Sequence, residues 1–234
     1  MRKSIVRKRS FPPSRGYGIL RGMCSYERFF DTASFPHPLL FERKKPVWEV
    51  LGKLKSYLDR YPLGSIEGKV HSRAVLENPH LIALGSETIV EPFAYVQGPC
   101  ILGKGCRIGQ GSHIRPYVVL GDGSVVGHGS EVKGSIFLNG AKAPHFNYVG
   151  DSVLGNSVNL GAGVICANLR LDEKAVFAEI DGIRFATNQR KLGAMIGDFS
   201  SIGCHSVINP GTVLNKGTRI RPLSSVCGKG DRVV

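Results

Sequence analysis

A period of six residues runs through most of this 234-residue chain. Six matches neither the 3.6-residue repeat of an α-helix nor the two-residue repeat of a strand, so the period describes a larger repeating object. An aliphatic residue occupies each sixth position in two long runs. The first run is Leu84, Val90, Val96, Leu102, Ile108, Ile114, Leu120, Val126, Val132 and Leu138, and the second is Ile196, Ile202, Ile208, Leu214, Ile220 and Val226.

The residues after each aliphatic position explain the period. Glycine often comes next, as at Gly85 and Gly103, and a small residue usually stands four positions on, as at Thr88 and Cys106. A short strand followed by a tight corner makes one side of a triangular coil, so three hexads make a coil of about 18 residues. The aliphatic residues then point at the axis and stack on coils about 4.8 Å away. The sequence therefore predicts an all-β solenoid, a parallel β-helix of about seven coils.

Composition excludes several other classes of protein. No apolar run reaches the roughly 18 residues of a membrane span, and the N-terminus lacks the apolar block of a signal peptide, so we expect a soluble, cytoplasmic protein. The six cysteines show no paired spacing typical of zinc ligands. Because Cys100 and Cys106 occupy the small inward position of the hexad, we interpret the cysteines as reduced core thiols and expect no metal site.

The charge of +13 is concentrated at the N-terminus. Residues 1–22 contain seven Lys and Arg and no acidic residue. We expect a disordered extension here, or an upstream choice of start codon, since Met23 begins the first segment that resembles a foldable one. A basic tail can also bind nucleic acid, but the solenoid lacks a basic stripe interleaved with aromatic residues, so we do not expect that function.

Residues 23–64 are predicted to form an N-terminal arm with a capping helix. Pro46 suits the first turn of a helix, and apolar residues then recur on one helical face until Tyr61. Since terminal coils of a solenoid need a cover, we expect this helix to cap the open N-terminal end. His37, in the arm before the helix, is interpreted as structural.

The solenoid domain, residues 65–234, contains two breaks in the period. The register slips between Leu138 and Leu154, and an inserted loop of about residues 167–195 follows later. Within this loop, Asp181-Gly182 separates two short apolar segments, which predicts a β-hairpin that serves as a lid or substrate wall. Functional residues commonly lie where a regular pattern is interrupted.

The first break holds the strongest candidate for chemistry. His145 lies there among a tyrosine, amides and lysines, on a fold that otherwise repeats small and aliphatic residues. Histidine is the side chain best suited to accept a proton near neutral pH. His128 and His205 lie in ordinary hexads and are interpreted as structural.

These residues carry a family resemblance over about residues 84–230. Lys142-Ala-Pro-His-Phe-Asn-Tyr-Val-Gly-Asp151 and Gly155-Asn-Ser-Val-Asn-Leu-Gly-Ala-Gly163 resemble the acetyltransferase domain of the bifunctional N-acetylglucosamine-1-phosphate uridylyltransferase/glucosamine-1-phosphate acetyltransferases. Ala167-Asn-Leu-Arg170, with Arg190-Lys-Leu-Gly193 and Ile196-Gly-Asp198, is closer to the archaeal sugar-1-phosphate nucleotidylyltransferase/acetyltransferases. The resemblance implies a left-handed β-helix, a homotrimer, and acetyl-CoA bound in grooves between subunits.

The resemblance also implies a role for each matching residue at the acceptor site. It makes His145 the general base that takes a proton from the attacking amine. Arg115 and Lys133 match a phosphate-binding arginine and lysine. Both suit a sugar phosphate, because the planar guanidinium binds phosphate through two hydrogen bonds and the ammonium acts as a point charge. Tyr148 and Asn159 match residues that hold the sugar.

Four further matches concern the acyl donor. Ala162 and Asn168 match positions that contact CoA, and Lys174 matches a lysine near the active site. Cys204 stands where the bacterial pattern has serine, a change that preserves packing but loses a hydroxyl hydrogen bond.

We therefore expect an acetyl-CoA-dependent N-acetyltransferase acting on an amino-sugar phosphate, in UDP-N-acetylglucosamine, nucleotide-sugar or cell-envelope precursor synthesis. The chain lacks the Gly-rich loop and the nucleotide-binding domain of the bifunctional relatives, so we expect no pyrophosphorylase activity. The same lack supports an alternative, a noncatalytic trimeric subunit that partners a separate sugar-phosphate nucleotidyltransferase chain.

Overall fold

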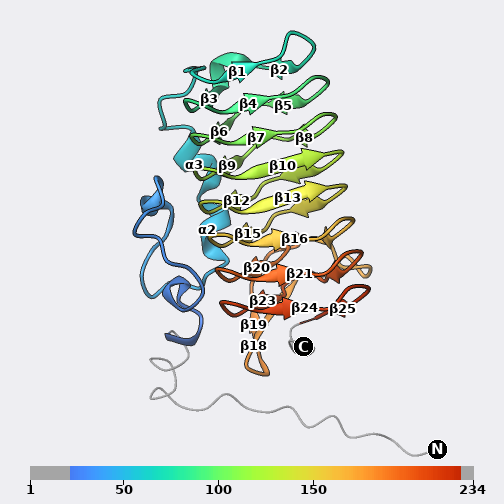
Figure 1. Cartoon of the computed structure of the whole chain (residues 1–234). Helices are drawn as coiled ribbons and strands as arrows, with labels where there is room; N and C mark the ends of the chain where they lie inside the picture. Colours follow the sequence, from blue (N-terminus) through green and yellow to red (C-terminus); the bar gives the residue numbers. More distant parts are fainter. Residues whose placement is uncertain (1–21, 228–234) are drawn as a thin grey trace, which may run out of the picture.

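The computed structural model describes residues 22–227 and shows a left-handed parallel β-helix, which confirms the predicted fold class (Figure 1). Strands of two to four residues stack into three parallel sheets, which form the three faces of a prism. The chain enters the prism at β1 and leaves it at β25, near the other end. The basic extension of residues 1–22 lies outside the described residues, apart from Gly22.

The three faces are named in the order in which the chain meets them. The first face stacks β1 (Lys69–Val70), β4 (Ile89–Val90), β7 (Arg107–Ile108), β10 (Val125–His128), β13 (Lys142–His145), β16 (Asn159–Leu160), β21 (Ser201–Ile202) and β24 (Arg219–Ile220). The second face stacks β2 (Val75–Glu77), β5 (Tyr95–Gln97), β8 (His113–Ile114), β11 (Glu131–Lys133), β14 (Tyr148–Gly150), β17 (Ile165–Cys166), β22 (Val207–Ile208) and β25 (Ser225–Val226). The third face stacks β3 (Ile82–Leu84), β6 (Cys100–Leu102), β9 (Val118–Leu120), β12 (Ile136–Phe137), β15 (Val153–Leu154), β20 (Met195–Ile196) and β23 (Val213–Leu214).

The axis of the prism is filled by the predicted aliphatic residues, with one exception. Leu138 does not point at the axis; Phe137 takes that place, in register with Leu120 above and Leu154 below. The corner before this strand is one residue shorter than in the preceding coil. Leu120 is the fifth residue after Arg115, whereas Phe137 is the fourth residue after Lys133. Leu138 therefore packs in a second hydrophobic cluster outside the coil.

That second cluster lies between the third face and the N-terminal arm. The outward side chains of the third face are apolar and would otherwise meet water, so an apolar cover stabilises them. Residues of the arm provide it, and Leu40 and Leu58 are among those fully buried there. The outward residues of the face are Ile101, Val119, Ile136, Val153, Met195 and Val213.

Between residues 24 and 64 the arm contains only short helices. These are η1 (Tyr26–Arg28), η2 (Pro38–Leu40), α2 (Glu49–Gly52) and α3 (Leu54–Leu58), and a further short helix, η3 (Pro79–Leu81), lies within the first coils. The helix predicted after Pro46 is present as α2 and α3, separated only by Lys53, whose backbone is also helical. The prediction that it caps the N-terminal end is wrong, because α2 and α3 run alongside the coils (Figure 1). The outward apolar strip of the third face, rather than the end of the prism, is their partner.

Hydrogen bonds from buried polar groups fasten the arm to the coils. The Asp198 side chain is fully buried and accepts hydrogen bonds from the backbone N–H of Asp31, at 2.7 Å, and of Asn156, at 2.8 Å. Within the arm itself, His37 is buried beside Tyr57 of α3, with its Nδ1 2.9 Å from the phenol oxygen. Burial lowers the pKa of His37 to about 4, so the ring is neutral in the folded protein.

The inserted loop contains the predicted hairpin. Strands β18 (Phe177–Ile180) and β19 (Ile183–Ala186) pair antiparallel around the Asp181-Gly182 turn. Arg28 of the arm donates two hydrogen bonds to the Asp181 carboxylate, at 2.7 and 2.9 Å. The hairpin thus packs with the arm and β23, and its inward residue Ala178 is fully buried.

Two cysteines differ from the expectation of core thiols. Cys204 and Cys227 are exposed, whereas Cys100 and Cys106 are buried at the inward positions as expected. Burial raises the pKa of Cys100 to about 12 and that of Cys106 to about 11, so both thiols are protonated and inert as nucleophiles. None of the helices in residues 22–227 is long and apolar enough to cross a membrane.

Candidate functional site

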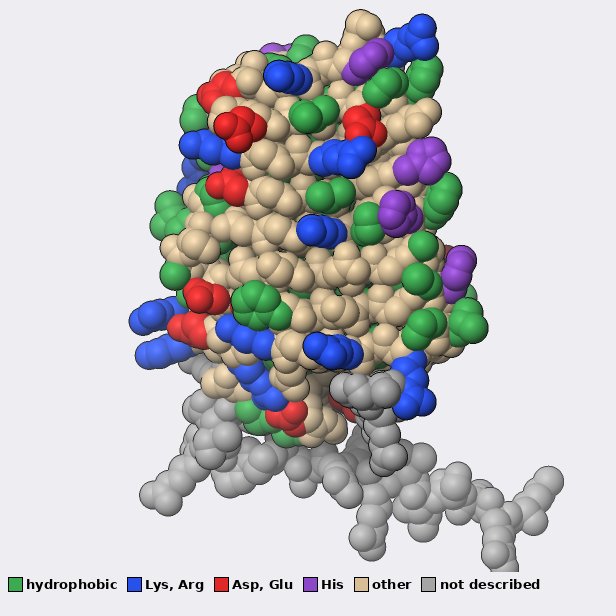
Figure 2. Space-filling view, viewed as in Figure 1, with side chains coloured by type: hydrophobic (Ala, Val, Ile, Leu, Met, Phe, Trp, Pro, Cys, Tyr) green, Lys and Arg blue, Asp and Glu red, His purple; other side chains and the backbone are tan. Residues whose placement is uncertain are grey.

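His145 lies on the edge where the first face turns into the second, which is called the first edge below. It ends β13 and is in register with His128, which ends β10 in the coil above. Both side chains are exposed, and Figure 2 shows histidines gathered along this edge of the prism. Among residues 22–227, no group hydrogen-bonds to the ring of His145, whereas Nδ1 of His128 lies 2.9 Å from the Gln110 carbonyl oxygen. The His145 ring is therefore open to a ligand.

The backbone beneath His145 is held firmly by Asn147. This side chain is 2% exposed, and its amide oxygen accepts a hydrogen bond from the His145 N–H at 3.0 Å. Its amide nitrogen donates to the Gly161 carbonyl in the next coil at 2.8 Å. The buried amide therefore determines the path of this corner, and the imidazole projects from a rigid frame.

Two of the predicted CoA-contacting residues continue the first edge below His145. Ala162 occupies the same corner one coil on, where the Gly163 N–H donates to the His145 carbonyl at 3.0 Å. Cys204 occupies it in the coil after, since the His205 N–H donates to the Ala162 carbonyl at 2.8 Å. At about 4.8 Å per coil, His145 and Cys204 lie roughly 10 Å apart along the edge. The structure thus places the predicted base and these two residues in one row.

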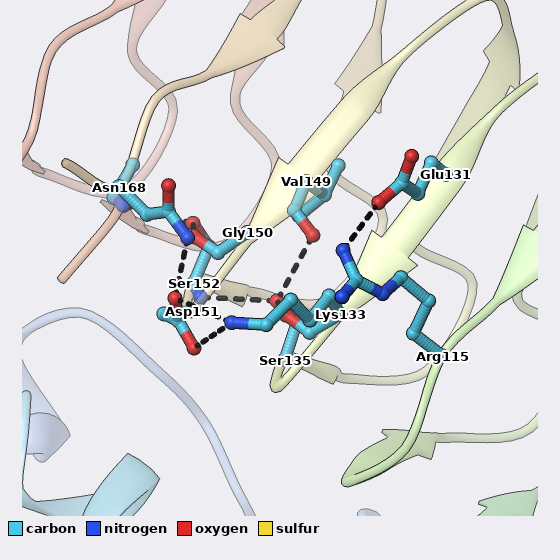
Figure 3. A network of polar contacts seen from close by, with 10 residues as sticks. Arg115, Glu131, Lys133, Ser135, Val149, Gly150, Asp151, Ser152 and Asn168 are labelled. Atoms are coloured by element: carbon cyan, nitrogen blue, oxygen red, sulfur yellow. Dashed lines mark hydrogen bonds and ion pairs between the residues drawn. The ribbon is translucent and has the colours of Figure 1, made fainter. Parts of the chain in front are cut away.

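A polar network lies on the opposite side of the second face, where it turns into the third, at what is called the second edge (Figure 3). The Lys133 ammonium pairs with the Asp151 carboxylate at 3.2 Å, and the Asn168 amide donates to the same carboxylate. The Arg115 guanidinium pairs with Glu131 at 3.0 Å. Three predicted residues, Arg115, Lys133 and Asn168, are therefore brought together here.

Tyr148 lies between the two edges, on the outside of the second face next to Glu131. Burial, together with the negative charges of Glu131 and Asp151, raises the pKa of Tyr148, so its phenol is a hydrogen-bond donor at neutral pH. Gly150 makes room for it, because a Cβ at this position would lie 2.7 Å from the Tyr148 hydroxyl and 2.7 Å from the Asn168 amide nitrogen.

Two predicted residues lie apart from both edges. Asn159 points outward from the first face, between Lys142 and Ser201. Lys174 is exposed within the inserted loop. The structure therefore does not gather the predicted residues into one pocket of a single chain.

The two edges are nevertheless close together. His145 and Gly150 are five residues apart along the second face, so no more than about 17 Å of backbone separates the two edges.

The carboxylates of the second edge were not predicted from the sequence. Asp151 follows Lys133 by 18 residues, one more than the coil that pairs Lys133 with Gly150, and Glu131 follows Arg115 by 16 residues, so both spacings are close to one coil. The coil length could have identified both pairs, since residues one coil apart lie next to each other in a β-helix. The Lys133 and Asp151 side chains are only 24% and 20% exposed, so the pair is partly shielded from water.

Comparisons with known proteins show the family of this chain. A family model described as the GMPPB C-terminal domain matches residues 69–182. The bifunctional sugar-1-phosphate nucleotidylyltransferase/acetyltransferase of Sulfurisphaera tokodaii is 37% identical over 175 residues, which cover 75% of this chain and 43% of that protein. The bifunctional protein GlmU of Methanocaldococcus jannaschii is 38% identical over 164 residues, 70% of this chain and 39% of that protein.

The chain is a homologue of the bifunctional GlmU-type proteins. The match lies in their C-terminal, acetyltransferase half, and the chain spans less than half the length of either relative. Among solved structures, a mutant perosamine N-acetyltransferase from Caulobacter crescentus in complex with CoA and GDP-perosamine covers 69% of this chain and 52% of its own. Its identity of 16% and TM-score of 0.32 are too low to relate individual residues.

Proposed function

We propose that this GlmU-type homologue transfers an acetyl group from acetyl-CoA to the amino group of a sugar phosphate. The observation that carries this proposal is the position of His145, an unpartnered imidazole on a rigid corner. The row of Ala162 and Cys204 continues along the same edge, and cationic side chains lie across the second face. The relatives' names support acyl transfer to sugar phosphates.

The chemistry assigned to His145 is proton transfer. A neutral amine attacks the thioester carbonyl, and the carbon–nitrogen bond forms as the imidazole accepts the amine proton. Collapse of the tetrahedral intermediate breaks the carbon–sulfur bond, and the CoA thiolate leaves and takes up a proton. Because no covalent acyl-enzyme is needed, one base in an accessible position suffices.

Side chains of the second face are proposed to hold the acceptor. Tyr148 donates a hydrogen bond to a sugar oxygen, and Arg115 and Lys133 contact the phosphate. Both cations are already paired with carboxylates, so the phosphate shares them with Glu131 and Asp151. Asn159 and Lys174 are proposed to act from a neighbouring subunit, since they do not lie on this face of the same chain.

The proposed assembly is a homotrimer in which a neighbouring copy closes a CoA-binding groove along the first edge. Large apolar side chains are exposed on this edge: Phe93 is 56%, Phe146 61% and Leu223 81% exposed. Consecutive members of this set stand three coils, roughly 14 Å, apart along the edge, so they offer a neighbouring copy separate apolar contact points along the proposed groove. We expect sedimentation analysis to give three chains per particle, and a monomer would contradict the shared groove.

The activity is tested by mixing the protein with acetyl-CoA and glucosamine-1-phosphate and measuring release of free thiol. His145→Ala should lower kcat by about 10²- to 10⁴-fold, the usual contribution of a general base. His128→Ala is the matched control, because this exposed histidine occupies the same edge one coil away. If His145→Ala retained the turnover of the His128→Ala control, the assignment of His145 as the general base would be wrong. If no amino-sugar phosphate reacted, the proposed enzyme activity would be wrong.

A further inference from the structure

A cavity of about 240 Å³ lies on the arm side of the second edge. One wall is the corner that carries Lys133 and Asp151, and the opposite wall is α3 of the arm, which contributes Lys55. The segment that follows β19 in the inserted loop adds Gln189 and Lys191. Three segments that are distant in the sequence thus meet around one hollow, and none of Lys55, Gln189 and Lys191 has a role in the acyl transfer proposed above.

The charges around this cavity are unbalanced. Three lysines and one aspartate line it, which gives a formal net charge of +2. Asp151 is already engaged by Lys133 and by Asn168. Lys55 and Lys191 form no ion pair with any residue in 22–227. Lys55 and Lys191 are exposed side chains of this lining, and an anion bound between the lysines reduces the repulsion between their like charges.

The size of the cavity limits the anion. Pockets for drug-sized ligands measure roughly 300 to 1,000 Å³, so this one suits a small group better than a nucleotide. A phosphate monoester carries a charge of about −1.5 to −2 at neutral pH, which matches the +2 of the lining. Lysine binds phosphate as a point charge, and the Gln189 amide can donate to a further oxygen.

We propose that this cavity is a phosphate-binding site, with Lys55, Lys133 and Lys191 as its cationic ligands. The bound group is a phosphomonoester or inorganic phosphate, which present the same dianion. Because α3 forms one wall, a bound phosphate bridges the arm to the second edge and stabilises the docked arm. Lys133 borders both the cavity and the second face, so this site shares one cation with the proposed acceptor site, whereas Lys55 and Lys191 line the cavity and have no role in the acyl transfer proposed above.

The test is titration of the full chain with inorganic phosphate by calorimetry at low salt. Lys55→Gln and Lys191→Gln should each raise the dissociation constant by about fivefold, and the double variant by about 25-fold, in the range of partly exposed charge pairs. Lys69→Gln removes the same charge from an exposed residue of β1 outside the cavity and should leave binding unchanged. Equal weakening by Lys69→Gln, or full binding by the double variant, would show that the cavity is not the site.

Two further measurements identify the source of the phosphate and separate this site from the enzyme activity. Glucosamine-1-phosphate that competes with inorganic phosphate, while glucosamine does not, and that binds the double variant as weakly as phosphate does, would identify the ligand of the cavity as a phosphomonoester. Glucosamine-1-phosphate that fails to compete would assign the site to free phosphate. Thermal unfolding followed by the fluorescence of Trp48, the sole tryptophan, should shift upward with phosphate in the wild type but not in the double variant. Since none of these readouts uses acetyl-CoA, they hold or fail independently of the result for His145→Ala.

Discussion

The two edges of the second face differ in how they are built. The first edge consists of regular corners in successive coils, and His145 stands on it with an exposed and unpartnered ring. The second edge is crowded, because the inserted loop leaves the coil there and the arm packs beside it. At this edge Arg115 and Lys133 are paired with carboxylates, whereas Lys55 and Lys191 form no ion pair with any residue in 22–227. A regular edge thus presents a reactive group, whereas an irregular edge collects charge from several segments.

The largest expected effect is on the free energy of unfolding. It comes from His37, which is buried in the arm that packs beside the second edge. Its folded pKa of about 4 lies below the ordinary value of 6.5, so the unfolded chain binds the proton more tightly. Stability is complete above pH 6.5 and falls as the pH decreases towards 4, by about 3 kcal/mol in all. Urea unfolding at pH 7 and pH 4.5, followed by Trp48 fluorescence, should show the loss, and His37→Phe should remove most of it. An equal pH dependence in His37→Phe would assign the effect to other groups.

The first edge is expected to depend on Asn147 instead. Asn147→Ala removes the amide that accepts from the His145 N–H and donates to Gly161, and it should lower the free energy of unfolding by about 2 kcal/mol. Displacement of the imidazole should also lower kcat, with little change in KM for the acceptor. Asn209→Ala is the control, because its side chain also bonds a neighbouring coil, at the Val226 carbonyl, but lies far along the prism from His145. A loss of stability with unchanged kcat in Asn147→Ala would mean that the corner does not position His145.

The smallest change in the free energy of unfolding is expected for the ion pair of the second edge. Asp151→Asn removes the charge that pairs with Lys133 while keeping the shape, and it should cost about 1 kcal/mol because the pair is partly shielded. Asp172→Asn, at the more exposed pair with Arg170, should cost less than Asp151→Asn. Chemical denaturation of the two variants compares these values directly. Identical costs would show that the crowding of the second edge does not strengthen its ion pair.

Much of the fold could be predicted because its period is local. Inward aliphatic residues, small corner residues and the Asp181-Gly182 turn are each visible within a few residues, and the structure has them with the exception of Leu138. The exception at Leu138 arose because one corner is a residue shorter, which shifts the next strand by one position and reverses the direction of its side chains.

The position of the arm could not be predicted from its own residues. An amphipathic helix shows that it needs an apolar partner but not which one, and both the end of the prism and the third face were available. The arm packs on the third face because the outward residues of that face, such as Val119 and Ile136, form an apolar surface.

The sequence by itself determined that this chain forms a β-helix related to acyltransferase domains and that His145 interrupts its pattern, because hydrophobic period and motif are properties of neighbouring residues. Only the tertiary structure decided that His145 stands on one edge while Arg115 and Lys133 stand on the other. It also brought Lys55 of the arm and Lys191 of the inserted loop to the same cavity as Lys133. Contacts between such distant segments depend on how the coils, the arm and the loop pack against one another, so no local sequence pattern predicts them.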